Sequence, residues 1–393
     1  MKPWPTAKLG EVLLHFQEYI AEPEPKIYPK LSVKLYGKGV LLDVPVDGTN
    51  LKMKRHQLAK AGQVILSEIW GKKGAIGFVP PEGEGALCTS HFFLFDVCGD
   101  KLDRRWLQAI FDANHLQSQL DAEAKGTTGY AAVRPKILLA CEIPLPPLAE
   151  QQRIVARIEE LATQINEART LRQQATDETE AFFYASLKQT RQSLLNSGLR
   201  TSKLGEITKV TSGGTPSREN AAFWNGNIPW VKTGELSDGD ISSAAERITP
   251  DAVENSSAKP FPPDTILIAL YGQGQTRGRT GRLLIQAATN QACCAILPRP
   301  ELFESRFIQY WLRSLYLELR EEAKGGAQPN WNGAMIKNLD VAIPHLPEQR
   351  RIVAELDALQ AQVDALKRLQ AETAAELDAL LPAVLDHAFK GDL

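Results

Sequence analysis

The chain has 393 residues, and a length of about 100 to 200 residues per domain predicts two to four domains. Hydrophobic residues at 43% and charged residues at 23% exclude a disordered or membrane-embedded protein. The net charge of −2 argues against a surface coated with nucleic-acid-binding groups. Charge is nevertheless segregated. Residues 51–81 carry six basic side chains and one acidic one, residues 265–299 carry four arginines and no acidic residue, and both windows are candidates for contact with phosphate.

The opening residues, M-K-P-W-P, lack the apolar core of a secretory signal. The most apolar window, residues 137–148, is interrupted by one glutamate and three prolines, so we expect no membrane-spanning segment. The five cysteines include no C-x-x-C pair, which indicates neither a zinc site nor a disulfide framework. This composition favours a cytoplasmic location.

Residues 1–145 are predicted to form a globular α+β block. Apolar runs at residues 64–66 and 92–95 are bounded by glycine-rich turns, as short strands are. Residues 102–124 have the pattern of a helix. Strands and helices mixed in this way predict an α+β domain.

Residues 146–198 are predicted to form a long helix. Its apolar residues step by four and three, which is the spacing of a coiled-coil seam, and they are Ile154, Ile158, Leu161, Ile165 and Ala168. The spacing is interrupted at Arg172, as happens where a heptad drifts.

The same order of elements follows in residues 199–342 and 343–393. The second α+β block has predicted strands at residues 265–268 and 295–297 and a predicted helix at 305–324. The helix after it has a seam of the same spacing, interrupted at residues 370–373, with Ile352, Leu356, Leu359, Val363 and Leu366.

An internal repeat relates the two halves. The sequence E-Q-Q-R-I-V-A at residues 150–156 recurs as E-Q-R-R-I-V-A at 348–354, displaced by 198 residues. Similar displacements relate K-L-G-E-V at residue 8 to K-L-G-E-I at residue 203, and E-A-K-G at residue 123 to E-A-K-G at residue 322. The chain is therefore predicted to have pseudo-two-fold symmetry.

The two helices are expected to pair with each other as an antiparallel coiled coil. A helix of about 45 residues spans roughly 65 to 70 Å, so the pair would act as a spacer. Two alternatives remain open: each helix packs on its own block, or each packs on another chain.

A loop at residues 271–282 is dense in glycine, glutamine and arginine. Glutamine pairs bidentately with adenine and arginine with guanine in the major groove, and further arginines hold phosphates. The candidate DNA-contacting residues are Tyr271, Gln273, Gln275, Arg277, Arg279 and Arg282. The alternative is a solvated run of charge. The corresponding loop of the first block is shorter and offers Lys72 and Lys73, so the halves are expected to read different sequences.

The second block also opens with a glycine-rich stretch, T-S-G-G-T-P-S, at residues 211–217. Glycines let a loop approach a ligand closely, and hydroxyl groups and amides hold phosphate oxygens. Ser217, Arg218 and Lys232 are therefore candidates for DNA contact. The alternative is a turn beside the core, and for the tryptophans of this stretch we favour core packing.

A third candidate surface ends each block, where a lysine and a glycine follow the helix. This pair is first of all a helix C-cap, and contact with DNA is an additional hypothesis. The residues concerned are Lys125, Thr127, Thr128 and Tyr130 in the first block and Gln328, Asn330 and Asn332 in the second.

No catalytic motif is visible in the sequence. The N-P-P-[YFW] tetrapeptide of amino-methyltransferases, the P-loop, H-E-x-x-H and G-x-S-x-G are all absent, and the six histidines lack metal-ligand spacing. Pro263 and Asp264, followed by E-A-K at residue 322, only faintly imitate a nuclease motif, because the E-A-K recurs in the first half without P-D. The chain is predicted to be non-catalytic and to hold no metal.

The sequence resembles the specificity subunits of type I restriction-modification systems over essentially its whole length. The resemblance rests on residues 203–206, 212–216, 223–230 and 323–330, on the two repeated helix starts at 147–156 and 344–354, and on the final A-F-K-G-D-L. The first block departs most, since it has no S-G-G-T-P or F-W-N-G segment.

The resemblance implies two target recognition domains, residues 1–145 and 199–342, each followed by a conserved spacer helix, residues 146–198 and 343–393. Each domain would read one half of an asymmetric bipartite site in double-stranded DNA. The helices, through residues such as Ile154 and Ile352, would pair and dock two copies of a modification subunit.

The resemblance also places all chemistry in partner subunits of a phage-defence system. The modification subunits would bind S-adenosylmethionine and methylate adenine, and two copies of a restriction subunit, where one exists, would use ATP and Mg²⁺. This chain would bind no cofactor. Two other classes stay open: the recognition half of a system with a fused methyltransferase-nuclease, and a scaffold whose blocks bind protein.

Overall fold

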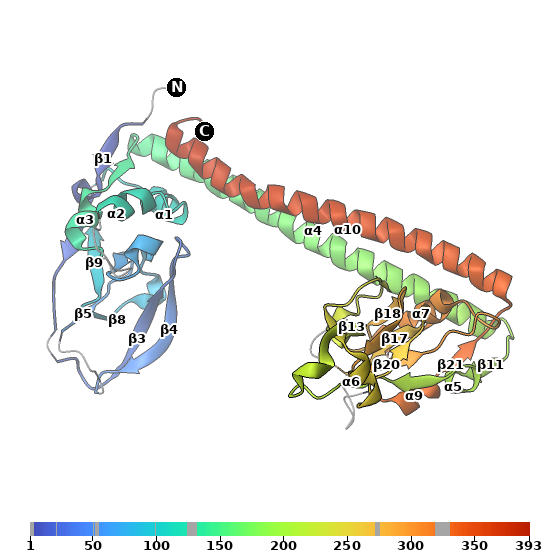
Figure 1. Ribbon diagram of the computed structural model, residues 1–393. Coiled ribbons are helices and arrows are strands. Elements are labelled where there is room, and N and C mark those ends of the chain that lie inside the picture. The colour runs from blue at the N-terminus through green and yellow to red at the C-terminus, as the bar shows by residue number, and fades with distance from the viewer. Residues whose placement is uncertain are drawn as a thin grey trace. The chain divides into compact units, whose positions relative to one another are not determined.

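The computed structural model describes residues 4–20, 22–49, 51, 55–98, 100–123, 132–271, 276–318 and 331–393. The chain divides into two compact units. Unit 1 comprises residues 1–171 and 372–393, and unit 2 comprises residues 172–371. Each unit holds one mixed domain of strands and helices together with a stretch of each of two long helices (Figure 1).

Domain 1 belongs to unit 1 and is built from short elements. Its helices are α1 (Arg104–Asp112), α2 (Gln117–Glu123) and α3 (Pro135–Ala140), with short 3-10 turns that include η2 (Gly71–Lys73). Its strands are β1 (Thr6–Lys8), β2 (Leu13–Phe16), β3 (Ile27–Val33), β4 (Val40–Asp47), β5 (His56–Leu58), β6 (Val64–Ser67), β7 (Ile76–Phe78), β8 (Leu87–Thr89), β9 (Phe92–Val97) and β10 (Glu142–Pro144).

Domain 2 belongs to unit 2. Its helices are α5 (Leu204–Ile207), α6 (Pro250–Glu254), α7 (Ser305–Ser314) and α9 (Gly333–Lys337). Its strands are β11 (Thr201–Lys203), β12 (Val210–Ser212), β13 (Trp224–Val231), β14 (Asp240–Ile241), β15 (Glu246–Ile248), β16 (Pro260–Phe261), β17 (Ile266–Ala269), β18 (Thr280–Leu283), β19 (Ala287–Thr289), β20 (Cys293–Ile296) and β21 (Asp340–Ala342).

Each domain contains its own antiparallel sheet, and the two sheets have the same arrangement of strands. The strand order is β2-β9-β6-β7 in domain 1 and β12-β20-β17-β18 in domain 2, where β14 adds a parallel edge. A two-stranded clasp recurs as well, β1 with β10 and β11 with β21. The sequence repeat is therefore a repeat of structure, and the prediction of two mixed domains, each followed by a long helix, is confirmed.

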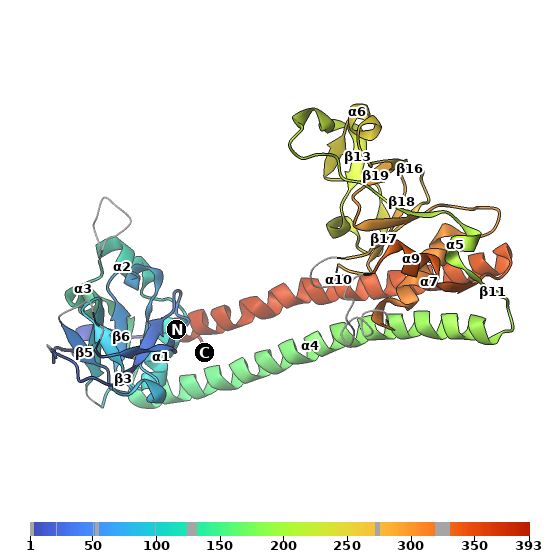
Figure 2. The same cartoon turned by 90° about the horizontal axis from the view of Figure 1, so that it is seen from below.

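Additions to the shared sheet differ between the domains. Domain 1 carries the hairpin β3–β4 and the pair β5–β8, whereas domain 2 carries a second sheet in the order β15-β13-β19-β16. In Figure 2 this second sheet and α6 lie on the side of domain 2 away from the long helices of unit 2. The shared parts account for the repeated sequence and the additions for its divergence.

The helix predicted over residues 102–124 is divided into α1 and α2. Asp103 caps α1 by accepting a hydrogen bond from the Arg105 amide at 2.8 Å. Asn114, between the two helices, has a φ of 52°, in the left-handed region where asparagine is tolerated and a helix cannot continue. The apolar pattern runs through this turn, so periodicity alone does not reveal it.

A buried glutamine at the start of each long helix explains the repeated E-Q motif. Gln151 accepts a hydrogen bond from the Asp103 amide and donates to the carbonyls of Lys101 and Pro146. Gln349 makes the same three bonds with Glu304, Leu302 and Pro344. Both side chains are fully buried. Each glutamine thus fixes a long helix to the first turn of α1 or α7.

The long helices are α4 (Leu148–Asn196) and α10 (Leu346–Lys390), and in each unit they lie side by side in opposite directions. In unit 1, Arg169 of α4 pairs with Asp378 of α10 at 2.8 Å. In unit 2, Thr176 donates to Gln370 at 3.0 Å and Lys367 lies 3.4 Å from Glu180. Residue numbers rise along one helix as they fall along the other, so the predicted antiparallel pairing within one chain is confirmed.

The seam residues pack on the partner helix and on their own domain at once. In unit 1, Ile154 and Ile158 share a core cluster with Trp106 of α1 and Phe389 of α10. Leu161 is half-buried, and Ile165 is buried. The open alternative that each helix packs on its own block is therefore correct alongside the pairing.

Unit 2 repeats this arrangement. Ile352, Leu356 and Val363 share a cluster with Trp311 of α7 and Leu187 of α4, and Leu359 packs against it partly buried. Leu366, which was predicted to continue the seam, is instead 43% exposed. Each domain is thereby joined to both helices of its unit by apolar side chains, which is the main stabilising contribution available to them.

The interruption of the seam does not break either helix. Both α4 and α10 run continuously through Arg172 and through residues 370–373. In place of an apolar contact, the hydroxyl of Thr176 bonds to the amide oxygen of Gln370. This polar step adjoins the division between the two units, which falls after Leu171 and after Ala371.

No helix in the described ranges is long and apolar enough to cross a membrane.

The cysteine thiols differ sharply in accessibility. Burial raises the pKa of Cys88, Cys293 and Cys294 to about 12, whereas Cys98 is exposed. Because the thiolate is the reactive form, we expect a thiol reagent such as iodoacetamide to label Cys98 first and the four buried thiols, those of Cys88, Cys141, Cys293 and Cys294, only after unfolding. Peptide mass spectrometry measures this, with Cys98→Ser as the control. Fast labelling of Cys294 in the folded protein would contradict the buried position of β20.

Candidate nucleic-acid interface

The two loops predicted to contact DNA occupy equivalent places in the shared sheet. One joins β6 to β7 and contains Lys72 and Lys73, and the other joins β17 to β18 and contains the arginine-rich stretch. The β17–β18 loop is longer. Gln273 and Gln275 of that loop lie outside the described residues. This structural equivalence agrees with the correspondence of the two loops in the sequence repeat.

The arginines of the β17–β18 loop have protein partners. Arg279 pairs with Asp238 at 2.9 Å, and the side chain of Arg279 is 22% exposed. Arg282 makes two hydrogen bonds of 2.8 Å to Asp240 and is 24% exposed. Composition predicted these two arginines as DNA contacts, and the structure places them in ion pairs inside domain 2. Tyr271 is 37% exposed and Arg277 is half-buried.

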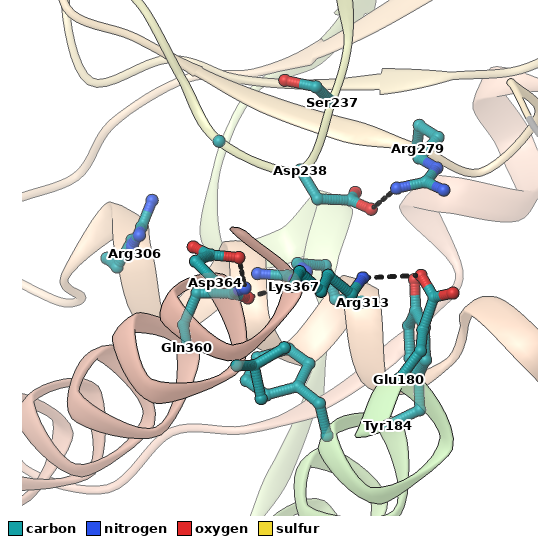
Figure 3. A pocket seen from close by; sticks show the side chains of 13 residues that line it. Glu180, Tyr184, Ser237, Asp238, Arg279, Arg306, Arg313, Gln360, Asp364 and Lys367 are labelled. Carbon is teal, nitrogen blue, oxygen red and sulfur yellow. Dashed lines mark hydrogen bonds and ion pairs between the residues drawn. The ribbon is translucent and has the colours of Figure 1, made fainter. Parts of the chain in front are cut away.

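Charged groups around Asp238 and Asp240 join domain 2 to the helices of unit 2. A cavity of about 190 Å³ lies there, and Figure 3 shows Asp238 and Arg279 facing Lys367, Gln360 and Arg313 across it. Arg313 donates to Gln360 of α10 at 2.8 Å. The cations of this cavity have acceptors on neighbouring elements, so its polar groups serve to hold the domain.

The same network includes Arg306 of α7, which also lines the cavity. Arg306 lies 3.1 Å from Asp240 and 3.0 Å from Asp357 of α10. Burial raises the pKa of Tyr184, which also lines the cavity, to about 12. The hydrogen bond from Arg282 lowers the pKa of Asp240. Since the pKa of Asp240 is lower in the folded state, its ion pairs stabilise the fold near neutral pH and lose effect as the pH falls through that value.

Arg218 and Lys232 gather on the second sheet of domain 2. The guanidinium of Arg218 stacks 3.7 Å from the centre of the Trp224 ring and pairs with Glu246 at 2.6 Å. Lys232 reaches the other oxygen of Glu246 at 2.5 Å. The hydrogen bonds from Arg218 and Lys232 lower the pKa of Glu246. Arg218 and the neighbouring Ser217 are exposed, so this stacked arginine is available at the surface.

The glycines before this cluster serve close packing. A Cβ on Gly213 would lie 2.2 Å from the carbonyl oxygen of Thr289, and one on Gly214 would lie 2.3 Å from Ser257. Trp230 is buried and donates to the carbonyl of Gly214 at 3.0 Å. The core interpretation of Trp230 is confirmed, and the glycines are required by backbone contact within the domain.

In domain 1, Lys73 is exposed and Lys72 is half-buried on η2. The Lys73 ammonium lies 5.1 Å from the centre of the Trp70 ring, which is 47% exposed. At the end of domain 2, the exposed side chain of Asn332 caps α9 by accepting from the Met335 amide at 3.0 Å. The other predicted end-of-block residues lie outside the described ranges, namely Lys125, Thr127, Thr128, Tyr130, Gln328 and Asn330.

No three His, Cys, Asp or Glu side chains gather as a metal site in the part of the chain that the structure describes.

Sequence reasoning missed the acidic partners of the arginines. Asp238 and Asp240 stand some 40 residues before Arg279 and Arg282 in the chain, and β14 brings them beside β18. It also missed the buried role of Gln151 and Gln349, although their recurrence in the repeat was a usable signal. Charge windows register how many cations a segment has and carry no information on which carboxylates face them.

The geometry defines a class of protein first: a chain with an internal repeat, in which two loop-bearing domains with different additions are each joined to paired helices. The family model of the type I restriction modification DNA specificity domain matches residues 2–176 and again residues 196–374. The two matches together cover most of the chain, one for each half. The chain therefore belongs to the family of type I restriction-modification specificity subunits.

Individual relatives agree with this assignment. The EcoR124I/EcoR124II specificity subunit of Escherichia coli is 30% identical over 158 residues, which span only 39% of each protein. The StySPI specificity subunit of Salmonella potsdam is 24% identical over 87% of this chain and 77% of its own length. A solved chain from a type I R-M system matches with a TM-score of 0.74 at 28% identity, covering 100% of this chain and 98% of that one. As a specificity subunit, the chain is the non-catalytic component of such a system.

Proposed function

We propose that this chain reads an asymmetric bipartite site in double-stranded DNA, one half through each domain. The observation that carries the proposal is the duplication: one sheet occurs twice, and its equivalent loops carry different residues. Lysines occupy the β6–β7 loop and arginines the β17–β18 loop. Two different loops on a repeated frame favour two different half-sites.

The residues proposed to contact DNA fall into two groups: cations exposed at the surface and cations held in ion pairs within the domain. Arg218, which is 53% exposed although it pairs with Glu246, and Lys73 stand at the surface over aromatic rings, where their charges can reach a ligand. Arg279 and Arg282 are proposed to position the β17–β18 loop through their aspartates. The contact itself is then left to Tyr271, Arg277 and the remaining loop residues.

We further propose that two copies of an adenine-N6 modification subunit dock on α4 and α10. Exposed apolar side chains on both helices support this docking. In unit 2, Phe182 is 60% exposed and Leu366 is 43% exposed. In unit 1, Leu171 is 65% exposed and Leu380 is 46% exposed. A groove of about 390 Å³ runs beside Phe182 and Leu366. One such set in each unit agrees with two copies, and exposed apolar patches commonly mark subunit interfaces.

The partners would supply every cofactor. S-adenosylmethionine would bind in the modification subunits, and ATP with Mg²⁺ in two copies of a restriction subunit where one is present. The chain's own task in the complex is recognition and spacing.

Methylome sequencing of cells with and without this chain, in the presence of its modification subunit, tests the proposal. We expect methylated adenines in a split motif of two unequal halves that appears only with the chain. Affinity of the purified complex for that motif should fall steeply between about 50 and 200 mM salt. A complex that showed neither sequence preference nor salt dependence would leave the protein-binding scaffold as the better explanation.

Arg277→Ala is expected to weaken recognition of one half-site only. Binding is compared on duplexes in which one or the other half is scrambled, and loss of one bidentate base contact corresponds to about 1–3 kcal/mol of discrimination. Arg350→Ala, which removes an exposed arginine outside the basic windows that pairs with Glu304 at 2.7 Å, is the charge-matched control. Equal binding by Arg277→Ala and the control would remove this loop from the interface.

A further inference from the structure

The tip of the β3–β4 hairpin is clamped beside the β6–β7 loop. The Tyr36 amide donates to the Lys73 carbonyl at 2.7 Å, and the Gly37 amide donates to the Gly74 carbonyl at 3.1 Å. Gly37 has a φ of 68°, and a Cβ there would lie 2.3 Å from the Phe111 carbonyl oxygen, so the tip also packs closely on α1. These contacts make the tip and η2 one continuous structure.

The side chains on this structure are basic and aromatic. Tyr36 is 57% exposed and Trp70 is 47% exposed. Lys34, Lys38 and Lys73 are exposed, and in the described part of the chain none of the three forms an ion pair. We call these five residues the hairpin-tip surface.

Lysines elsewhere on the same hairpin are neutralised. Lys26 pairs with Glu24 at 2.8 Å, and Lys30 pairs with Asp43 at 3.0 Å. Asp112, whose backbone adjoins Gly37, accepts a hydrogen bond from Gln108 at 2.5 Å, and burial raises its pKa. Positive charge is therefore least compensated at the tip, where the described residues form no ion pair, although the charge of Lys34 acts at a distance on Asp43.

Tyr36 occupies a backbone conformation that favours glycine. Its φ is 58°, in the left-handed region, where a bulky aromatic residue is rare and strained. Its side chain is exposed and so gains little from packing in the domain. An exposed ring held in a strained conformation is better explained by contact with a ligand than by stability.

The tip of the β3–β4 hairpin lies beside the β6–β7 loop, which is shorter than its counterpart in domain 2. The β6–β7 loop is the structural counterpart of the longer arginine-rich β17–β18 loop. Among the described residues, the β3–β4 hairpin has no counterpart in the sheets of domain 2. The hairpin thus brings extra cations to the place where domain 2 uses a longer loop.

We propose that the hairpin-tip surface holds the sugar-phosphate backbone of duplex DNA in domain 1, an inference that rests on the proposed DNA-reading function. Lys34, Lys38 and Lys73 pair with phosphate oxygens, and the Tyr36 ring packs on deoxyribose with its hydroxyl directed to a phosphate. This contact sets the register of domain 1 on its half-site, and base reading falls to the neighbouring loop.

The test uses the full chain in complex with its modification subunit and a duplex bearing the mapped site. Lys34→Ala combined with Lys38→Ala should lower the slope of log affinity against log salt by about 2, one for each phosphate that the variant no longer neutralises. Tyr36→Gly should weaken binding about 10-fold, in line with the loss of one hydrogen bond to a charged phosphate. Its unfolding temperature should stay equal or rise, because glycine relieves the strained φ.

Lys26→Ala combined with Lys30→Ala is the matched control, since it removes the same two charges from the hairpin outside its tip. Wild-type affinity and salt slope in all the tip variants would overturn the proposal. So would variants that bind DNA normally but fail to assemble with the modification subunit, which would make the tip a protein contact. If the wild-type complex itself shows no salt-dependent binding, the DNA-reading function fails with it, and the two failures are thereby distinguished.

Discussion

Gln349→Ala is expected to destabilise unit 2 by about 3–5 kcal/mol. The side chain is fully buried, and it accepts from the Glu304 amide at 2.9 Å and donates to the carbonyls of Leu302 and Pro344 at 3.0 and 2.7 Å. Alanine leaves one amide and two carbonyls buried without partners, each at about 1–3 kcal/mol, together with a cavity. A domain has about 5–15 kcal/mol of stability in all, so the loss is severe.

Chemical denaturation with hydrogen exchange read by mass spectrometry measures the effect and assigns it to a unit. Protection should fall around α7 and the start of α10. Gln151→Ala should produce the same loss in unit 1, around α1 and the start of α4. Gln362→Ala, at an exposed glutamine of α10, is the control and should change little. A loss below about 1 kcal/mol at Gln349 would mean that the three bonds do not fix the helix start.

The repeat made most of this fold accessible from the sequence. Short apolar runs bounded by glycine-rich turns predicted strands such as β6 and β17, which are buried along their whole length, and an apolar spacing of three to four residues predicted the long helices. The displaced copies of E-Q-x-R-I-V-A then showed that each helix begins in the same way. The bonds of Gln151 and Gln349 explain the motif, and they involve carbonyls that no pattern of side chains reveals.

Prediction of the candidate site was less complete, for a physical reason. The sequence of a glycine-rich loop does not show whether its arginine contacts DNA or an aspartate of the same domain. The partner of Arg282 is determined by the parallel pairing of β14 with β18, which places Asp240 opposite it. The tip lysines Lys34 and Lys38 lie in a further basic stretch, residues 26–38, which carries four lysines and no acidic residue and which the sequence reasoning passed over. Only the folded hairpin brings them to Lys73.

Matched insertions in α4 and α10 are expected to lengthen the gap between the two half-sites without changing either half. Three heptads placed after Gln174 and three after Ala371 fall between the Arg169–Asp378 and Thr176–Gln370 contacts in both helices, so each unit keeps its own contacts. Whole heptads also keep the apolar seam in phase. The insertion adds about 31 Å to each helix at 1.5 Å per residue.

At about 3.4 Å per base pair this length corresponds to roughly nine base pairs, close to one turn of DNA, so both domains would still face the same side of the duplex. Methylome sequencing reads the new gap directly. The same insertion in α4 alone is the control: the helices would then lose their matched pairing, and modification should cease. An unchanged gap in a paired variant that still methylates DNA would show that α4 and α10 do not set the spacing, and the recognition domains would then have to be positioned by the modification subunits.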